Sequence, residues 1–76
     1  MNVTFTSSAE NDLRNIHWRE AGHVARAVFQ FAATGEGNVQ PRDETGRRLR
    51  LIVGSYAVVM TFDRAEGLTV WRIFRR

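Results

Sequence analysis

Arginine is the residue type in this sequence whose number and spacing could do chemistry. All eleven basic residues are arginine, against eight acidic residues, which leaves a net charge of +3. Seven of them lie between positions 47 and 76, and Arg42 lies just ahead. A guanidinium is cationic at any cellular pH, and its planar fork fits phosphate oxygens and base edges. The charge is compatible with nucleic-acid binding and also with an ordinary protein surface.

Two of these arginines alternate with leucines in the segment RLRLIV, residues 48–53. Side chains alternate between the two faces of a strand, so Arg48 and Arg50 fall on one face while Leu49 and Leu51 fall on the other. We expect the arginine face to be free of helices, where it could bind phosphate. The alternative is the solvated face of an edge strand, where charge prevents aggregation with other sheets.

The remaining arginines of this half lie in or next to a predicted meander of three antiparallel strands, of which residues 48–53 form the first. Gly54 and Ser55 form a tight turn after the basic strand, and Tyr56 to Phe62 (YAVVMTF) is apolar enough for a covered central strand. Residues 63–67 form a second turn. Leu68 to Phe74 (LTVWRIF) forms the third strand, which is followed by two further arginines.

The first third of the chain predicts a strand and two helices. Asn2 to Thr6 alternates polar and apolar residues, as a short strand does. Ser7 and Glu10 have capping-box spacing, which predicts that the first helix begins at Ser7. A second helix is indicated by the apolar rhythm between Ala21 and Ala32. The spacing leaves open whether a kink or a turn near His17 joins the helices.

The segment that follows the second helix is polar. Gly35 is placed for a left-handed helix cap, and residues 38–46 (NVQPRDETG) are predicted to form a loop leading into the basic strand. The expected fold is therefore α+β and spans residues 1–76 as one domain. It has an amino-terminal strand, two helices and a three-stranded antiparallel meander, with both helices packed on one face of a four-stranded sheet.

Composition excludes several other classes of protein. A content of 43% hydrophobic residues supports a packed core, and the absence of cysteine excludes disulfides and thiolate metal sites. His17 and His23 are six positions apart and do not share a helix face, so we expect no metal and no cofactor. No apolar run approaches the roughly 18 residues that span a bilayer, so a cytoplasmic protein is expected. Trp18 and Trp71 could stack on bases, although core packing or partner contact is the preferred interpretation.

Four stretches of the sequence together resemble a known family. They are VTFTSSAENDL (Val3–Leu13), AATGEGNV (Ala32–Val39), RLRLIVGSYAVVMTFD (Arg48–Asp63) and VWRIFRR (Val70–Arg76). This pattern resembles the RelE/ParE superfamily of toxins from bacterial toxin–antitoxin modules, and the likeness is weakest at residues 40–46. The resemblance implies a toxin neutralised by a cognate antitoxin. The RelE branch cuts mRNA in the ribosomal A site, whereas the ParE branch inhibits DNA gyrase.

The resemblance also implies a site. In the RelE branch, cleavage is served by basic residues on the strand before a G-x-Y turn, by an arginine directly after that tyrosine, and by an arginine ending the last strand. The matching positions imply catalytic roles for Arg48, Arg50 and Arg76, and RNA contacts for Arg47, Arg72 and Arg75. Ala57 stands where the arginine after the tyrosine is expected, and a family tyrosine beyond the last arginine has no counterpart.

These departures matter because cleavage by a 2′-hydroxyl needs a base and an acid as well as charge stabilisation on the phosphate. Arginines supply the charge but transfer protons poorly. The loss of one preorganised donor costs on the order of 10²- to 10³-fold in rate. The sequence therefore predicts a ribosome-dependent endoribonuclease with an incomplete catalytic set. The alternatives are a gyrase inhibitor and a degenerate toxin that only binds its antitoxin.

Overall fold

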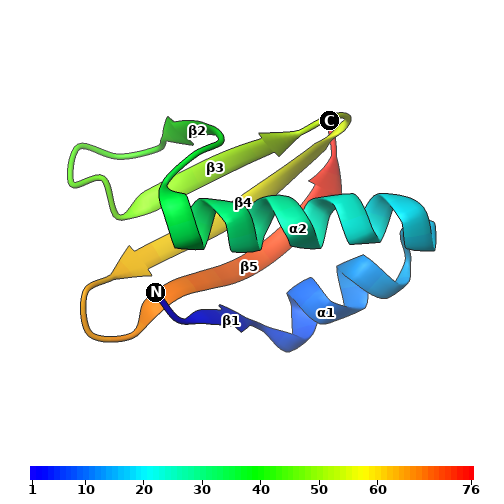
Figure 1. The fold of residues 1–76 in the computed structure, drawn as a ribbon, viewed down its shortest axis with the longest axis horizontal. Helices are drawn as coiled ribbons and strands as arrows, with labels where there is room; N and C mark the ends of the chain where they lie inside the picture. Colours follow the sequence, from blue (N-terminus) through cyan, green and yellow to red (C-terminus); the bar gives the residue numbers. More distant parts are fainter.

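A five-stranded sheet and two helices make up the computed structural model, which describes residues 1–76 (Figure 1). In chain order the elements are β1 (Val3–Phe5), α1 (Ser7–Arg14), α2 (Trp18–Thr34), β2 (Asn38–Pro41), β3 (Arg48–Val53), β4 (Tyr56–Asp63) and β5 (Gly67–Arg75). The strand order across the sheet is β1-β5-β4-β3-β2. β1 pairs parallel to β5, and the other neighbours are antiparallel.

The predicted four-stranded sheet with both helices on one face is wrong. The fifth strand, β2, lies inside the segment predicted to be a loop, and it pairs along β3 from Asn38 opposite Ile52 to Pro41 opposite Leu49. Its polar composition concealed it, because an edge strand faces solvent and tolerates proline, whose missing N–H is not needed there. α1 lies along the edge of β5 beyond β1, where Asp12 accepts a hydrogen bond from the Ile73 backbone N–H.

α2 covers the face of the sheet that carries the apolar side chains. Its buried residues pack with β3, β4 and β5 in one cluster that contains no polar side chain. The largest fully buried members are Val24, Val28, Leu51, Val58, Met60, Leu68 and Val70. The alternation predicted for residues 48–53 is confirmed, since Leu49 and Leu51 are buried and Arg48 is exposed. The arginine side of β3 is consequently the face opposite α2.

A β-bulge interrupts the pairing of β4 with β5. The register passes from Val59 opposite Arg72 directly to Met60 opposite Val70, which leaves Trp71 as an extra residue without a partner. An extra residue shifts the phase of side-chain alternation. Val70 and, beyond the bulge, Ile73 are therefore both buried in the core.

The helix caps differ in part from the prediction. The first helix is capped by Thr6, whose Oγ1 accepts from the Ala9 backbone N–H at 3.1 Å, and not by Ser7. α2 begins directly after His17, whose Nδ1 accepts from the Arg19 N–H at 3.2 Å. A turn therefore joins the helices. The predicted cap at Gly35 is confirmed by its left-handed backbone, with φ of 76°.

Neither α1 nor α2 has both the length and the apolar character that a helix needs to cross a bilayer.

Candidate nucleic-acid interface

A groove of about 520 Å³ lies on the face of the sheet opposite α2. We call it the open-face groove. Its lining residues come from β3, β4, β5 and the connection after β2, and they are Arg42, Arg48, Leu49, Arg50, Val59, Met60, Thr61, Trp71 and Phe74. Three arginines and two aromatic rings thus share one concave surface. This volume is within the range typical of small-ligand sites.

Arg48 and Arg50 enter this groove from the same side of β3. Arg48 lies opposite Thr61 and Arg50 lies opposite Val59 in the pairing with β4. Arg42 joins them because its backbone N–H donates to the Arg48 carbonyl at 2.8 Å, which continues the hairpin of β2 and β3. Sequence reasoning missed Arg42 as a site residue, because the segment around it was interpreted as a loop. The polar alternation of a solvated edge strand was the signal available.

The guanidinium of Arg50 is held among apolar atoms. Its central carbon lies 5.6 Å from the centre of the Phe74 ring, a cation–π arrangement. Its Nε is buried and has no hydrogen-bond partner in the protein. A buried donor without a partner is costly, and a charged donor more so. An anionic group in the groove cannot reach this buried Nε and would have to bind the terminal nitrogens of the guanidinium.

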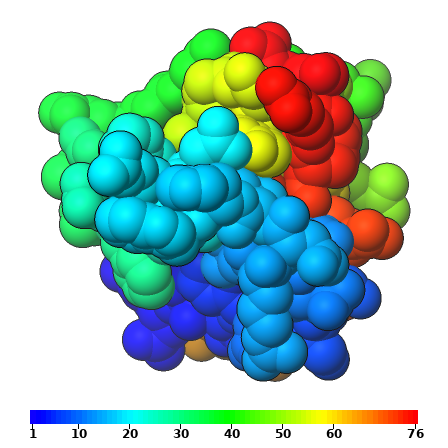
Figure 2. All heavy atoms as spheres, turned by 90° about the vertical axis from the view of Figure 1, so that its right-hand side faces the viewer, coloured from blue at the N-terminus to red at the C-terminus, as the bar shows by residue number.

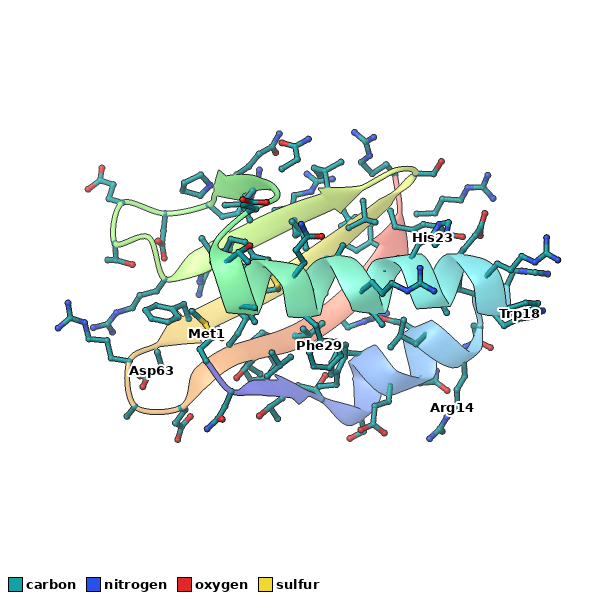
Figure 3. The ribbon with its side chains drawn as sticks, viewed as in Figure 1. Met1, Arg14, Trp18, His23, Phe29 and Asp63 are labelled. Atoms are coloured by element: carbon teal, nitrogen blue, oxygen red, sulfur yellow. The ribbon has the colours of Figure 1, made fainter.

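The indole of Trp71 spans β4 on the same face. Its Nε1 donates to the Thr61 hydroxyl at 2.7 Å, and 48% of the residue surface is exposed. Of the two interpretations preferred from the sequence, core packing is therefore wrong for Trp71, and contact with a partner stays a prediction. The same holds for Trp18, which is 72% exposed at the start of α2 (Figure 3).

Arg76 lies outside the open-face groove. Its guanidinium donates to the Gly54 carbonyl at 2.7 Å, and its backbone N–H donates to Ser55 at 2.7 Å. Arg72 lies level with Arg50 across the sheet, because both are opposite Val59. Arg76 is four residues beyond Arg72, which is about 13 Å of strand. Figure 2 shows this end of the molecule, where the end of β5 lies beside the turn between β3 and β4. The three arginines to which the resemblance gives catalytic roles therefore do not lie together, because Arg76 is apart from Arg48 and Arg50.

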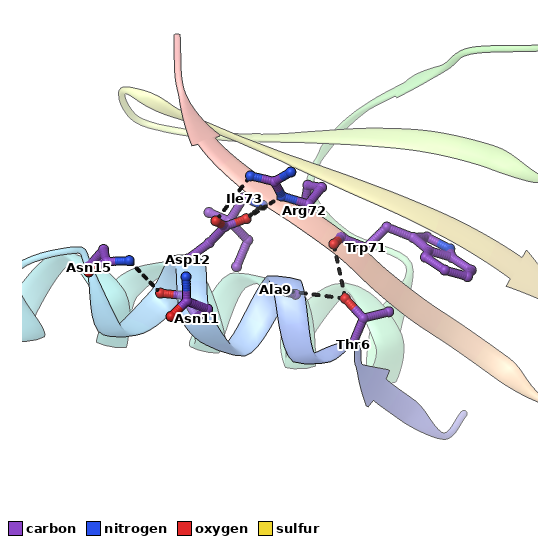
Figure 4. Close-up of polar contacts among 8 residues, drawn as sticks. All are labelled: Thr6, Ala9, Asn11, Asp12, Asn15, Trp71, Arg72 and Ile73. Atoms are coloured by element: carbon purple, nitrogen blue, oxygen red, sulfur yellow. Dashed lines mark hydrogen bonds and ion pairs between the residues drawn. The ribbon is translucent and has the colours of Figure 1, made fainter.

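The other three predicted RNA-binding arginines also lie outside the groove. Arg72 forms an ion pair with Asp12 of α1, with Nε at 2.8 Å and a second bond at 3.3 Å (Figure 4). Arg75 lies opposite Tyr56 and lines a separate hollow beside α1. Arg47 is exposed, and its carbonyl accepts from the Phe62 N–H at 2.8 Å. Of these three arginines, Arg72 has a structural role, because its ion pair with Asp12 links α1 to β5.

The Asp12 carboxylate is the polar link between α1 and β5. The hydrogen bond from Arg72 is the largest influence that lowers the pKa of Asp12 below its ordinary value of 3.8, and the bond from the Ile73 N–H adds to it. Asp12 raises the pKa of Arg72 in return, mainly through the same hydrogen bond. The charged form of Asp12 is thus favoured in the folded protein.

Asp12→Asn is expected to make unfolding less dependent on pH. A lowered folded-state pKa contributes stability that is present above the unfolded value of about 3.9 and is lost as pH falls through the folded value. The variant should therefore be less stable than the parent at pH 7, and the difference should shrink below pH 4. Urea unfolding midpoints at pH 7 and pH 3 measure it. Glu44→Gln, which removes an exposed carboxylate remote from α1, is the control, and an undiminished difference would contradict the prediction.

Two further positions bear on catalysis. Ala57, where the resemblance implied an arginine, is fully buried opposite Phe74, so no cation reaches the groove from there. The Tyr56 hydroxyl turns toward α2 and donates to Glu20 at 2.6 Å, a bond that is the largest cause of its raised pKa. The groove lining contains no histidine, carboxylate, lysine or tyrosine. It can bind and polarise a phosphate, but it has no group suited to proton transfer near neutral pH.

Metal binding finds no support in the arrangement of side chains. No three of the histidines and carboxylates lie close enough together to hold an ion. His17 caps α2 through its Nδ1. His23 is exposed along α2 (Figure 3).

No protein-family model matches this chain, and no curated protein matches it. Solved structures do. A chain of the toxin–antitoxin complex RelBE2 from Mycobacterium tuberculosis is similar with a TM-score of 0.81 and 22% identity, covering 99% of this chain and 96% of that one. A chain of the RelB-RelE antitoxin–toxin complex from Methanococcus jannaschii is similar with a TM-score of 0.76 and 12% identity, covering 96% and 89%. These likenesses establish the fold that the chain shares with both.

Proposed function

We propose that this chain is the toxin of a bacterial toxin–antitoxin module, a single RelE-like domain that engages mRNA on the ribosome in the cytoplasm. A cognate antitoxin would neutralise it. Two independent findings support the proposal: the sequence resembles the RelE/ParE toxins, and the fold is similar to chains from two complexes described as toxin–antitoxin. The basic open-face groove supports RNA as the ligand.

The observation that carries the RNA assignment is that Arg42, Arg48 and Arg50 line one groove. Arginine forks bind phosphate oxygens in pairs of charge-assisted hydrogen bonds. Three such groups on one concave surface would follow successive phosphates of a strand. None of the three forms an ion pair within the chain.

Cleavage would use Arg48 and Arg50 to stabilise charge on the phosphate at the scissile bond. Arg76 would join them only after releasing the Gly54 carbonyl, to which its guanidinium is bonded. The 2′-hydroxyl and the leaving oxygen need proton transfer that the groove lining does not supply. We therefore propose slow, ribosome-dependent endoribonuclease activity, with the ribosome or water transferring the protons.

A second candidate is a toxin-like protein that binds its partner or RNA without cutting. Two observations favour it, namely the buried Ala57 and a groove without an acid or a base. No feature of the groove favours DNA gyrase as the target. Gyrase inhibition is one possible outcome of expressing the protein in bacteria.

Expression in bacteria with sequencing of mRNA ends separates these functions. The proposed function predicts growth arrest and new ends within codons of translated messages, both reduced in the Arg48→Ala, Arg50→Ala double variant. Blocked translation with intact messages would favour the non-cutting candidate. An SOS response with intact messages would indicate gyrase and overturn the assignment to mRNA. Co-expression of the reading frame adjacent to the gene should relieve the arrest if it encodes the antitoxin.

A further inference from the structure

We propose that the open-face groove selects unpaired RNA by stacking nucleobases on the separate rings of Trp71 and Phe74, while Arg48 and Arg50 hold the neighbouring phosphates. This inference rests on the proposed function. Stacking would make the groove prefer RNA with exposed bases over a sugar–phosphate backbone without bases. Trp71 and Phe74 would be the rings that contact the bases.

The bulge in β5 is what places the two rings on the same face of the sheet. Trp71 and Phe74 are three positions apart, and on a regular strand they would point to opposite faces of the sheet. Because Trp71 is the extra residue in the pairing with β4, the alternation shifts, and both rings line the groove. Figure 4 shows the Trp71 side chain extending from β5 away from α1. Bulges commonly re-aim side chains at functional sites in this way.

Both rings are anchored and yet accessible. The Trp71 indole is fixed by the bond from its Nε1 to Thr61, which engages the ring edge and leaves the ring faces to other contacts. Trp71 is 48% exposed and Phe74 is 43% exposed. The Arg50 guanidinium lies against Phe74, so a base placed there would meet a ring and a cation together. Stacking on such platforms tolerates any base, because each has a π-face.

The arrangement favours a single strand over a duplex. A duplex keeps its bases stacked inside and presents mainly phosphates and sugars, so its bases cannot reach rings at the floor of a groove. A single strand can turn one base inward while adjacent phosphates reach the arginines. Exposed aromatic rings between arginines would otherwise be an unexplained apolar patch on a charged surface.

Fluorescence titration of the full chain tests the inference. Trp18→Phe, at the start of α2, leaves Trp71 as the sole tryptophan and serves as the background. The probes are a short single-stranded oligoribonucleotide, an abasic oligomer of equal length and charge, and an RNA duplex. We expect the base-containing single strand to quench Trp71 and to bind about 5- to 100-fold tighter than the abasic one. The Trp71 variants lack the fluorophore, so their affinities are measured by the anisotropy of labelled oligomers. Trp71→Ala should remove that preference, and Trp71→Phe should restore most of it.

The outcomes separate this inference from the proposed function. Equal binding of both single strands, with Arg48→Ala and Arg50→Ala still weakening both, leaves the RNA function standing and overturns base stacking. Binding of neither oligomer at low salt overturns both. Phe74→Leu, which removes the second ring while keeping an apolar side chain, gives an independent measurement. A base preference unchanged in both ring variants would overturn the inference and assign the rings to contact with a protein partner.

Discussion

Replacing Arg48 and Arg50 together with alanine is expected to weaken binding to single-stranded RNA on the order of 100-fold at low salt. A hydrogen bond to a charged group contributes about 1.5 kcal/mol or more, and the two arginines supply at least one each. The dependence of affinity on salt should flatten as well, because each phosphate contact on a single strand adds about 0.7 to the slope of log affinity against log salt. Loss of two contacts predicts a decrease of about 1.4, measured by anisotropy across a salt series.

A matched control separates local contacts from net charge. Arg26→Ala with Arg64→Ala removes the same two charges from exposed positions outside the groove, on α2 and in the turn after β4. This variant should keep most of the salt slope. The groove variant should remain folded, because the Arg50 Nε has no hydrogen bond to lose and its contact with Phe74 is worth about 0.5–1 kcal/mol. Equal weakening in both variants would show that RNA senses only overall charge.

The fold was predictable from sequence where burial imposes a period. Leu49 and Leu51 alternate with arginines, and the structure buries the leucines because only one face of β3 meets α2. β2 was harder to predict, since only Val39 of its four residues packs against the core and one apolar residue establishes no clear period. The bulge at Trp71 was not predictable, for a different reason. LTVWRIF fits an ordinary strand, and only the pairing with β4 reveals an extra residue.

The candidate site was also predictable only in part. Arg48 and Arg50 share a face because they are two positions apart on one strand, which the sequence alone shows. Arg76 belongs to a different strand, and its place relative to them depends on the register of β5, which sequence alone does not specify. The register puts it beside Gly54. The contribution of Trp71 and Phe74 to the groove depends on the bulge, so the aromatic half of the site could be identified only from coordinates.

Gly67→Ala is expected to be the most destabilising single change predicted here. Gly67 is buried with φ of 87°, and a Cβ at this position would collide with the backbone carbonyl of Asn2. That carbonyl accepts from the Leu68 N–H at 2.8 Å and begins the parallel pairing of β1 with β5. We expect a loss of about 3 kcal/mol or more, from left-handed strain of about 1–2 kcal/mol and a buried backbone bond worth about 1–3. Urea unfolding measures it.

Gly46→Ala is the matched control, because Gly46 has a similar φ of 73° and open space around the added carbon. It should show only the strain, so the difference between the two variants isolates the collision with Asn2. Equal losses would mean that β1 yields without cost.

The consequence reaches the open-face groove, because the end of β1 holds the bulge. The Thr6 N–H donates to the Val70 carbonyl at 3.0 Å. The Thr6 hydroxyl donates to the Trp71 carbonyl at 3.0 Å (Figure 4). A displaced β1 should therefore loosen Trp71 even where the chain remains folded. We expect Gly67→Ala to weaken the preference for base-containing RNA, which Gly46→Ala should leave intact.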